Sequence, residues 1–202
     1  MKLRISKIFS QLVCLALLGT TASTAVAGMP YCALRDPAQQ IYKLFPEAQS
    51  YKSEVHTVDA TVRDQVANEL PFTLHERELG RHTIYVPVVE GQGAGVLHVR
   101  SEASEWGLVE VAWALDASLQ VIDFNLQRCR GASCKQVDSE AFKNRLRGLG
   151  ATELAALLDS DQQHLAEPLV GLDGDGLVLA ATVIRSGMKT IAVTSHLQTE
   201  GG

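Results

Sequence analysis

The stretch GLVLAATVIRSGMKTIAVTSHL, residues 176–197, is the longest apolar-rich run after the N-terminal segment. At its centre lies a polar group, residues 185–190, in which Ser186 and Gly187 stand close to Lys189. As a helix, the run carries one apolar stripe at spacings of three and four residues, formed by Leu177, Ala181, Ile184, Met188 and Ile191. As a hairpin, its β-branched residues would form two strands with a turn at Ser186 and Gly187. The periodicity favours an amphipathic helix packed on a sheet, with the polar group in its N-terminal part or its middle.

The N-terminus has the pattern of a secretory signal peptide. Lys2, Arg4 and Lys7 precede an apolar stretch, residues 8–18, and the segment ends with Ala25-Val26-Ala27. We expect residues 1–27 to be removed after Ala27 and residues 28–202 to form one exported domain in the periplasm. No membrane span is expected after cleavage, because two cations of the late apolar run, Arg185 and Lys189, would lie near the centre of the bilayer.

The composition is that of a globular domain, with 46% hydrophobic and 20% charged residues among 202. The formal net charge is −5, and it becomes more negative once the basic leader is removed. Because nucleic-acid phosphates need a basic surface, an acidic chain of this kind argues against nucleic acid as a partner.

Three cysteines follow the expected cleavage site, namely Cys32, Cys129 and Cys134. An odd number in an oxidising compartment leaves one thiol over or pairs it between chains. A local disulfide between Cys129 and Cys134 is one possibility, and a bond between Cys32 and Cys129 is the main alternative.

The order of predicted elements indicates an α+β fold. Helices are expected at residues 37–47, 61–70, 139–149 and 152–158, and strands at residues 51–58, 83–89, 94–99, 106–115 and 119–126. Thr152 is a possible N-cap, and residues 101–105 are expected to form a connection between strands. Because the connections between the later strands are short, we expect an antiparallel sheet, a meander of hairpins, packed against helices in a single domain.

Few residues show a pattern typical of catalysis. The six histidines are scattered without metal-ligand spacing, so a metal site is not expected. Glu110 alternates with two valines in a predicted strand, so that it faces solvent or a ligand, and the solvated face is favoured. Arg128 and Arg130 leave the sheet together, and they could clamp a phosphate or form a solvated basic loop. No catalytic residues are assigned.

The region from His82 to Cys134, the following predicted helix and the late Ser-Gly segment together resemble the periplasmic FMN-binding domain of the flavin subunits of Rnf complexes and of the sodium-translocating quinone reductase. In that family the late segment reads Ser/Thr-Gly-Ala-Thr, and its last threonine carries FMN through a phosphoester bond. Ser186 and Gly187 match this motif, whereas Lys189 stands at the acceptor position and Thr190 follows one residue later. The family's earlier Glu-Thr-Pro-Gly segment is also missing here.

The resemblance implies a domain that takes part in periplasmic electron transfer, as a carrier or accessory protein rather than as a stand-alone enzyme. The implied cofactor is FMN, held without a covalent bond by Ser186, Gly187, Lys189 and Thr190. The implied partner is a periplasmic or membrane-bound redox protein. The alternative is a flavin-free accessory or interaction subunit of a periplasmic redox assembly, which the lysine at the acceptor position favours, and a small-molecule sensor is a third option.

Overall fold

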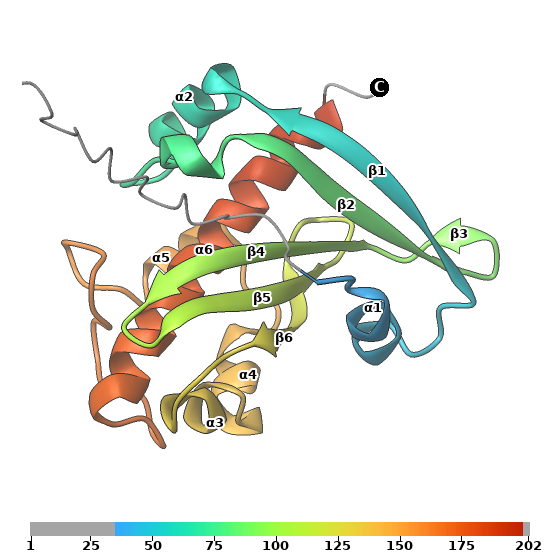
Figure 1. The fold of residues 1–202 in the computed structure, drawn as a ribbon. Helices are drawn as coiled ribbons and strands as arrows, with labels where there is room; N and C mark the ends of the chain where they lie inside the picture. Colours follow the sequence, from blue (N-terminus) through green and yellow to red (C-terminus); the bar gives the residue numbers. More distant parts are fainter. Residues whose placement is uncertain (1–34, 200–202) are drawn as a thin grey trace, which may run out of the picture.

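A six-stranded antiparallel sheet lies at the centre of the fold in the computed structural model, which describes residues 35–199 (Figure 1). The strands are β1 Ser50–Val58, β2 Gly80–Val89, β3 Gln92–Gly93, β4 Val96–Ser104, β5 Gly107–Leu115 and β6 Val121–Arg128. They follow the order β1-β2-β4-β5-β6, with the short β3 paired to β2. The predicted α+β class with an antiparallel sheet is confirmed.

Helices precede, interrupt and follow this sheet. They are α1 Ala38–Leu44, α2 Ala60–Glu69, the one-turn 3-10 helix η1 Glu76–Glu78, α3 Ser133–Val137, α4 Glu140–Leu146, α5 Ala151–Ala155 and α6 Gly174–Thr199. The side chain of Asp59 caps α2 by accepting hydrogen bonds from the amides of Thr61 and Val62, as its position before the apolar stripe predicts. Ser139 caps α4 in the same way, by accepting from the amide of Phe142.

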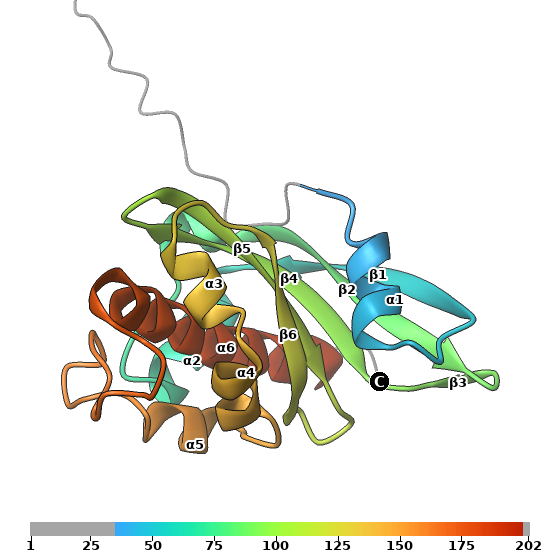
Figure 2. The same cartoon turned by 90° about the horizontal axis from the view of Figure 1, so that it is seen from below.

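The two faces of the sheet are buried against different helices. Along β5, Val111, Trp113 and Leu115 belong to the larger core beneath α6, whereas Ala112 and Ala114 belong to a smaller core with α1. Figure 2 shows α6 with α3, α4 and α5 on one side of the sheet and α1 on the other. Because successive strand residues point to opposite faces, this alternation fixes which side chains of β4 and β5 can meet α6.

The late apolar run is one long helix, so its hairpin alternative is wrong. Helix α6 begins at Gly174 and spans 26 residues, which places Ser186 and Gly187 in its middle. By length and composition alone, residues Gly174–Gln198 could cross a membrane, but 78% of the apolar window is buried inside the fold. A central core helix has the same properties, because its apolar stripe is wide and is covered on several sides.

Three local expectations are wrong. Residues 101–104 continue β4, because Ser101 to Ser104 pair with Glu110 to Gly107 in register. Thr152 lies inside α5, and Gly150 is the N-cap residue. The basic loop after β6 contains α3. The signal peptide, its cleavage site at Ala27 and the pairing of Cys32 lie outside the described residues.

Candidate functional site

Lys189, which was predicted to hold a flavin phosphate, belongs to a buried group of four charged side chains. We call this group the charge network; its members are Glu78 of η1, Arg100 and Glu102 of β4, and Lys189 of α6. The side chain of Arg100 is fully buried, and those of Glu78, Glu102 and Lys189 are 2%, 8% and 13% exposed. Two carboxylates therefore face two cations at the interface between the sheet and the central helix.

The two cations bridge the same two carboxylates. Nζ of Lys189 donates to Oε1 of Glu78 at 3.0 Å and to Oε2 of Glu102 at 3.2 Å. Arg100 donates from Nη2 to the other oxygen of Glu78, and its Nε lies 3.6 Å from Oε1 of Glu102. Removing one partner of such a buried network leaves a charge without compensation, which costs several kcal/mol.

The carboxylate of Glu78 accepts hydrogen bonds from both cations of the charge network and from a backbone amide. Burial raises the pKa of its carboxyl group, but the charges of Arg100 and Lys189 and the amide of His75 outweigh burial, so the pKa lies below its ordinary value of 4.5. The amide of His75 donates to Oε1 of Glu78 at 3.1 Å. The carboxylate of Glu78 is therefore ionised at neutral pH.

A chain of two histidines and one threonine continues from the charge network. Nε2 of His82 lies 2.7 Å from the carbonyl oxygen of Glu78, Nδ1 of His82 lies 3.2 Å from Nε2 of His98, and Nδ1 of His98 lies 3.2 Å from Oγ1 of Thr194. A carbonyl oxygen only accepts, so His82 donates to it from Nε2 and accepts at Nδ1 when neutral. His98 then donates from Nε2, and Thr194 donates to Nδ1 of His98. We call these three residues the histidine chain.

Both imidazoles are held in the neutral form. Burial, together with the charge of Arg100, lowers the pKa of His82 from 6.5 to about 4. Burial lowers the pKa of His98 well below its ordinary value, and His82 and Arg100 add to this effect. Neutral imidazoles are what the directional hydrogen bonds of the histidine chain require.

The sequence contains a signal for this polar interior that was missed. His98, Arg100 and Glu102 alternate along β4 with residues of the smaller core, Leu97 and Val99. A polar alternation in a strand is usually assigned to the solvated face. Here that face of β4 turns toward α6, and the buried polar side chains find their partners on α6 and η1.

The other three predicted flavin residues are part of the packed helix. The Ser186 hydroxyl accepts a hydrogen bond from Nε1 of Trp113 at 3.3 Å, and Oγ1 of Thr190 donates to the carbonyl oxygen of Ser186 at 2.8 Å. A Cβ atom at Gly187 would lie 2.9 Å from Cη2 of Trp113. Ser186 and Thr190 are fully buried.

These positions do not fit a flavin site in this structure. Gly187 brings the helix backbone into close contact with the indole ring of Trp113, which fills the space directly in front of this glycine. A phosphate near Lys189 would also meet the carboxylates of Glu78 and Glu102, whose charges oppose its own. The structure brings Ser186, Gly187, Lys189 and Thr190 together on one helix, but it uses them in the core.

Arg128 and Arg130 line one hollow of about 340 Å³, together with Arg35 and Lys135. The wall of this hollow contains the disulfide between Cys129 and Cys134, with an S–S distance of 2.08 Å. The local pairing of these two cysteines is therefore confirmed, and the alternative pairing of Cys129 with Cys32 is wrong. The two arginines that the sequence singled out do lie at one site.

Glu110 does not face solvent, so the favoured expectation for this residue is wrong. Its side chain is fully buried, and Oε2 accepts from Nε2 of Gln127 at 3.5 Å. It lies on the same side of β5 as Ala112 and Ala114, which pack in the smaller core. Because this part of β5 is covered on both faces, Glu110 has no solvated face to occupy.

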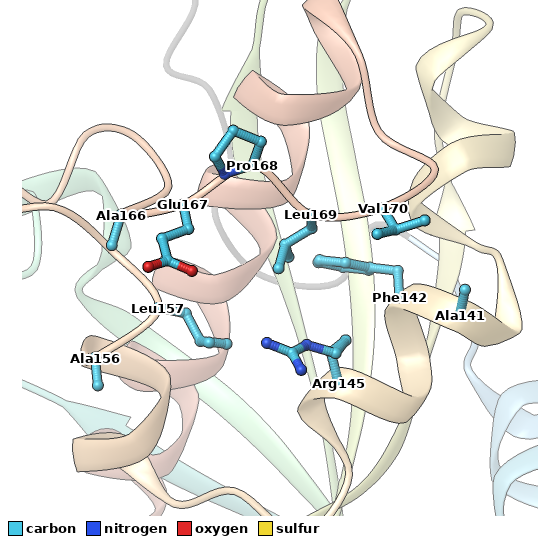
Figure 3. A pocket seen from close by; sticks show the side chains of 10 residues that line it. All are labelled: Ala141, Phe142, Arg145, Ala156, Leu157, Ala166, Glu167, Pro168, Leu169 and Val170. Carbon is cyan, nitrogen blue, oxygen red and sulfur yellow. The ribbon is translucent and has the colours of Figure 1, made fainter.

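A larger hollow, of about 480 Å³, lies between α4, α5 and residues 166–170 (Figure 3). Phe142, Leu157 and Leu169 form apolar walls, and the side chains of Arg145 and Glu167 point toward the same space. The residues predicted from the sequence do not line it. The side chains of Arg145 and Glu167 are exposed, so this groove does not indicate a particular reaction.

One group with metal-ligating atoms is found within residues 35–199, on the loop after α5. It consists of Asp159, Asp161 and His164, whose ligand atoms lie within 4.8 Å of one another. Nδ1 of His164 lies 3.4 Å from Oδ2 of Asp159, and Asp159 also accepts from the amides of Gln163 and His164. These contacts show that the three side chains stabilise the conformation of the loop.

Comparisons with models of known protein families, with curated proteins and with solved structures found no match to this chain.

Proposed function

We propose that this chain is an exported, flavin-free accessory domain that acts by interaction within a periplasmic redox assembly. The observation that supports this proposal is the pairing of Lys189 with Glu78 and Glu102 at 3.0 and 3.2 Å. The resemblance to FMN-binding domains supplies the redox context, and the signal-peptide pattern supplies the export.

The residues predicted to bind flavin already contact other groups of the protein, and these contacts are the physical support for the proposal. A lysine that serves a phosphate needs a free ammonium group, whereas Lys189 is ion-paired with two buried carboxylates. Releasing it would leave the carboxylates of Glu78 and Glu102 with Arg100 alone, and the desolvation of a buried charge without a partner is expensive. Trp113 fills the space in front of Gly187 in the same way.

The competing function is electron transfer by a bound flavin at Ser186, Gly187, Lys189 and Thr190. It would require α6 to move away from Trp113 and the charge network to open. Such a movement exposes a fully buried indole and separates paired charges, so it is the less favourable of the two functions.

The test is the visible absorption spectrum of the protein purified from its native compartment. The accessory function predicts a colourless protein. A flavin spectrum at about one flavin per chain would refute the proposal, and denaturation followed by filtration would then separate non-covalent from covalent flavin.

A further inference from the structure

Four cations line the hollow at the disulfide, and within residues 35–199 none of them has an ion-pair partner. Arg35 precedes α1, Arg128 ends β6, Arg130 follows it in the loop and Lys135 lies in α3. Among residues 35–199, no carboxylate oxygen lies within 4.0 Å of any of these four side chains. We call this set the cationic hollow. On an acidic chain it is a local concentration of positive charge.

The carboxylate at the edge of the cationic hollow is already neutralised. Asp138 lines the hollow, but its Oδ1 lies 2.7 Å from Nζ of Lys143. Lys143 thus takes up this negative charge, so Asp138 does not neutralise the cations of the hollow.

The frame of the cationic hollow is tied together by covalent and hydrogen bonds. The disulfide holds Cys129 and Cys134 with their Cα atoms 5.9 Å apart. Nε2 of Gln127 donates to the carbonyl oxygen of Arg35 at 3.0 Å, which fixes the segment before α1 to β6. A site whose backbone is fixed in advance loses less entropy when it binds.

An exposed tryptophan adjoins the cationic hollow. Trp106 is 52% exposed, and its ring lies 3.3 Å from the position of a Cβ atom at Gly131, which has a φ of +103°. Trp106, Arg130 and Val178 line a second, smaller hollow, which Glu105 and Asp175 also line, and Val178 is 50% exposed. Arg130 therefore connects the cations with an apolar surface. Tryptophan and arginine are the residues most enriched where protein partners bind tightly.

We propose that the cationic hollow and the adjoining surface of Trp106 and Val178 form a docking site for an acidic segment of a partner protein. Carboxylates of the segment meet Arg35, Arg128, Arg130 and Lys135, and an apolar side chain of the segment packs on Trp106. This proposal rests on the proposed function, because a domain without its own cofactor acts through the partner it binds.

The shape and the charge of the surroundings favour a short protein segment over other polyanions. Nucleic acids and anionic membranes present extended arrays of negative charge, which would also face the acidic remainder of this chain. A short segment can stay within the hollow. The apolar surface of Trp106 and Val178 next to the cations matches a peptide better than an inorganic oxyanion.

The test is fluorescence anisotropy with a fluorescein-labelled peptide rich in glutamate and containing leucine. Wild-type protein is expected to bind it, more weakly as salt increases. The double variant Arg128→Glu/Arg130→Glu is expected to bind at least about tenfold more weakly. Lys52→Glu/Arg77→Glu, which makes the same change in charge on exposed residues outside the hollow, is expected to retain most of the affinity. Trp106→Ala is expected to weaken binding with little change in its salt dependence.

Several outcomes overturn the proposal. They are failure of the wild-type protein to bind the peptide, equal losses in the two double variants, displacement of the peptide by millimolar inorganic phosphate alone, and binding to phosphatidylglycerol vesicles in place of the peptide. Circular dichroism of each variant verifies folding, and Arg128→Gln/Arg130→Gln replaces the charge reversal if that variant does not fold.

The same samples separate this proposal from the proposed function. A colourless protein that does not bind the peptide contradicts the docking site alone. A protein that binds the peptide and carries stoichiometric flavin contradicts the flavin-free function alone.

Discussion

Nζ of Lys189 lies 3.0 Å from Oε1 of Glu78, although the two residues are 111 positions apart in the sequence. This contact joins the middle of α6 to the one-turn helix before β2, and Glu102 completes it from β4. The central helix is thus attached to the sheet by ion pairs as well as by its apolar stripe. This attachment makes the stability of the fold sensitive to charge and to pH.

Replacing Lys189 with methionine is expected to destabilise the protein. Methionine keeps much of the side-chain volume but leaves two buried carboxylates with Arg100 as their cation, which should cost about 3–5 kcal/mol of the free energy of unfolding. Urea denaturation at neutral pH measures this loss. Lys52→Met, on the exposed face of β1, serves as the control and is expected to show no measurable change. A Lys189→Met variant as stable as wild type would contradict the role of the charge network.

Mild acid is expected to destabilise the fold through the histidine chain. The pKa of His82 is about 4 in the folded protein, against 6.5 for an ordinary histidine, and that of His98 is also lowered. The unfolded chain therefore binds protons first as the pH falls, so the free energy of unfolding is highest above pH 6.5 and decreases between pH 6.5 and 4. For His82 alone the decrease is on the order of 3 kcal/mol.

Urea denaturation at several pH values in this window measures the effect. A His82→Gln/His98→Gln variant should be less stable at neutral pH but should show a flatter pH dependence. His164→Gln, in an exposed loop, should keep the wild-type slope. The lowered pKa of Glu78 acts in the same direction, but its contribution is lost below the ordinary carboxyl value of 4.5. An unchanged slope in the double variant would show that the histidines are not the source.

Gly187→Ala is expected to destabilise the protein, although alanine is the better helix former. Helix propensity favours alanine by about 1 kcal/mol. The added Cβ would lie 2.9 Å from Cη2 of Trp113 and 3.2 Å from Cδ1 of Leu154, and overpacking of this kind costs about 1–3 kcal/mol. We therefore expect the midpoint temperature of thermal unfolding to decrease slightly. In a Trp113→Phe background the same substitution should become neutral or stabilising, and an equal loss in both backgrounds would exclude the clash as its cause.

Removing the disulfide is expected to lower the stability of the protein without unfolding it. The two cysteines are separated by five positions, and closing so short a loop stabilises a protein by about 2 kcal/mol. A Cys129→Ser/Cys134→Ser variant should therefore remain folded at room temperature with a lower unfolding midpoint in urea. A variant that is unfolded in buffer would indicate that the disulfide does more than fix the loop before α3.

Local sequence signals predict the elements of this fold well and its interior less well. Asp59 before an apolar stripe predicts α2, and the period of two predicts β5, because both depend on neighbouring residues. The stripe of residues 176–197 predicts α6 as the favoured of two alternatives. The end of β4 was missed because Ser101 and Glu102 resemble a turn in composition, and only their pairing with β5 shows that they are strand residues.

The charge network could not be predicted in the same way, because its partners come from three distant segments. Lys189 appears in the sequence next to Ser186 and Gly187, and that local pattern suggests a ligand site. Of its carboxylate partners, Glu78 carries no local mark of burial, and the alternation in β4 that includes Glu102 is usually assigned to a solvated face. Arg128 and Arg130 were found because both neighbours of Cys129 are cationic, and this signal is local.

The most direct test of the central claim is a titration of FMN with the purified wild-type protein, followed by flavin fluorescence. Because Lys189 is paired with Glu78 and Glu102, we expect no saturable quenching at micromolar concentrations of protein and FMN, and no difference between wild type and Lys189→Met. Saturable quenching at one flavin per chain that is lost in a folded Lys189→Met variant would contradict the account, because it would show that this lysine serves a flavin phosphate.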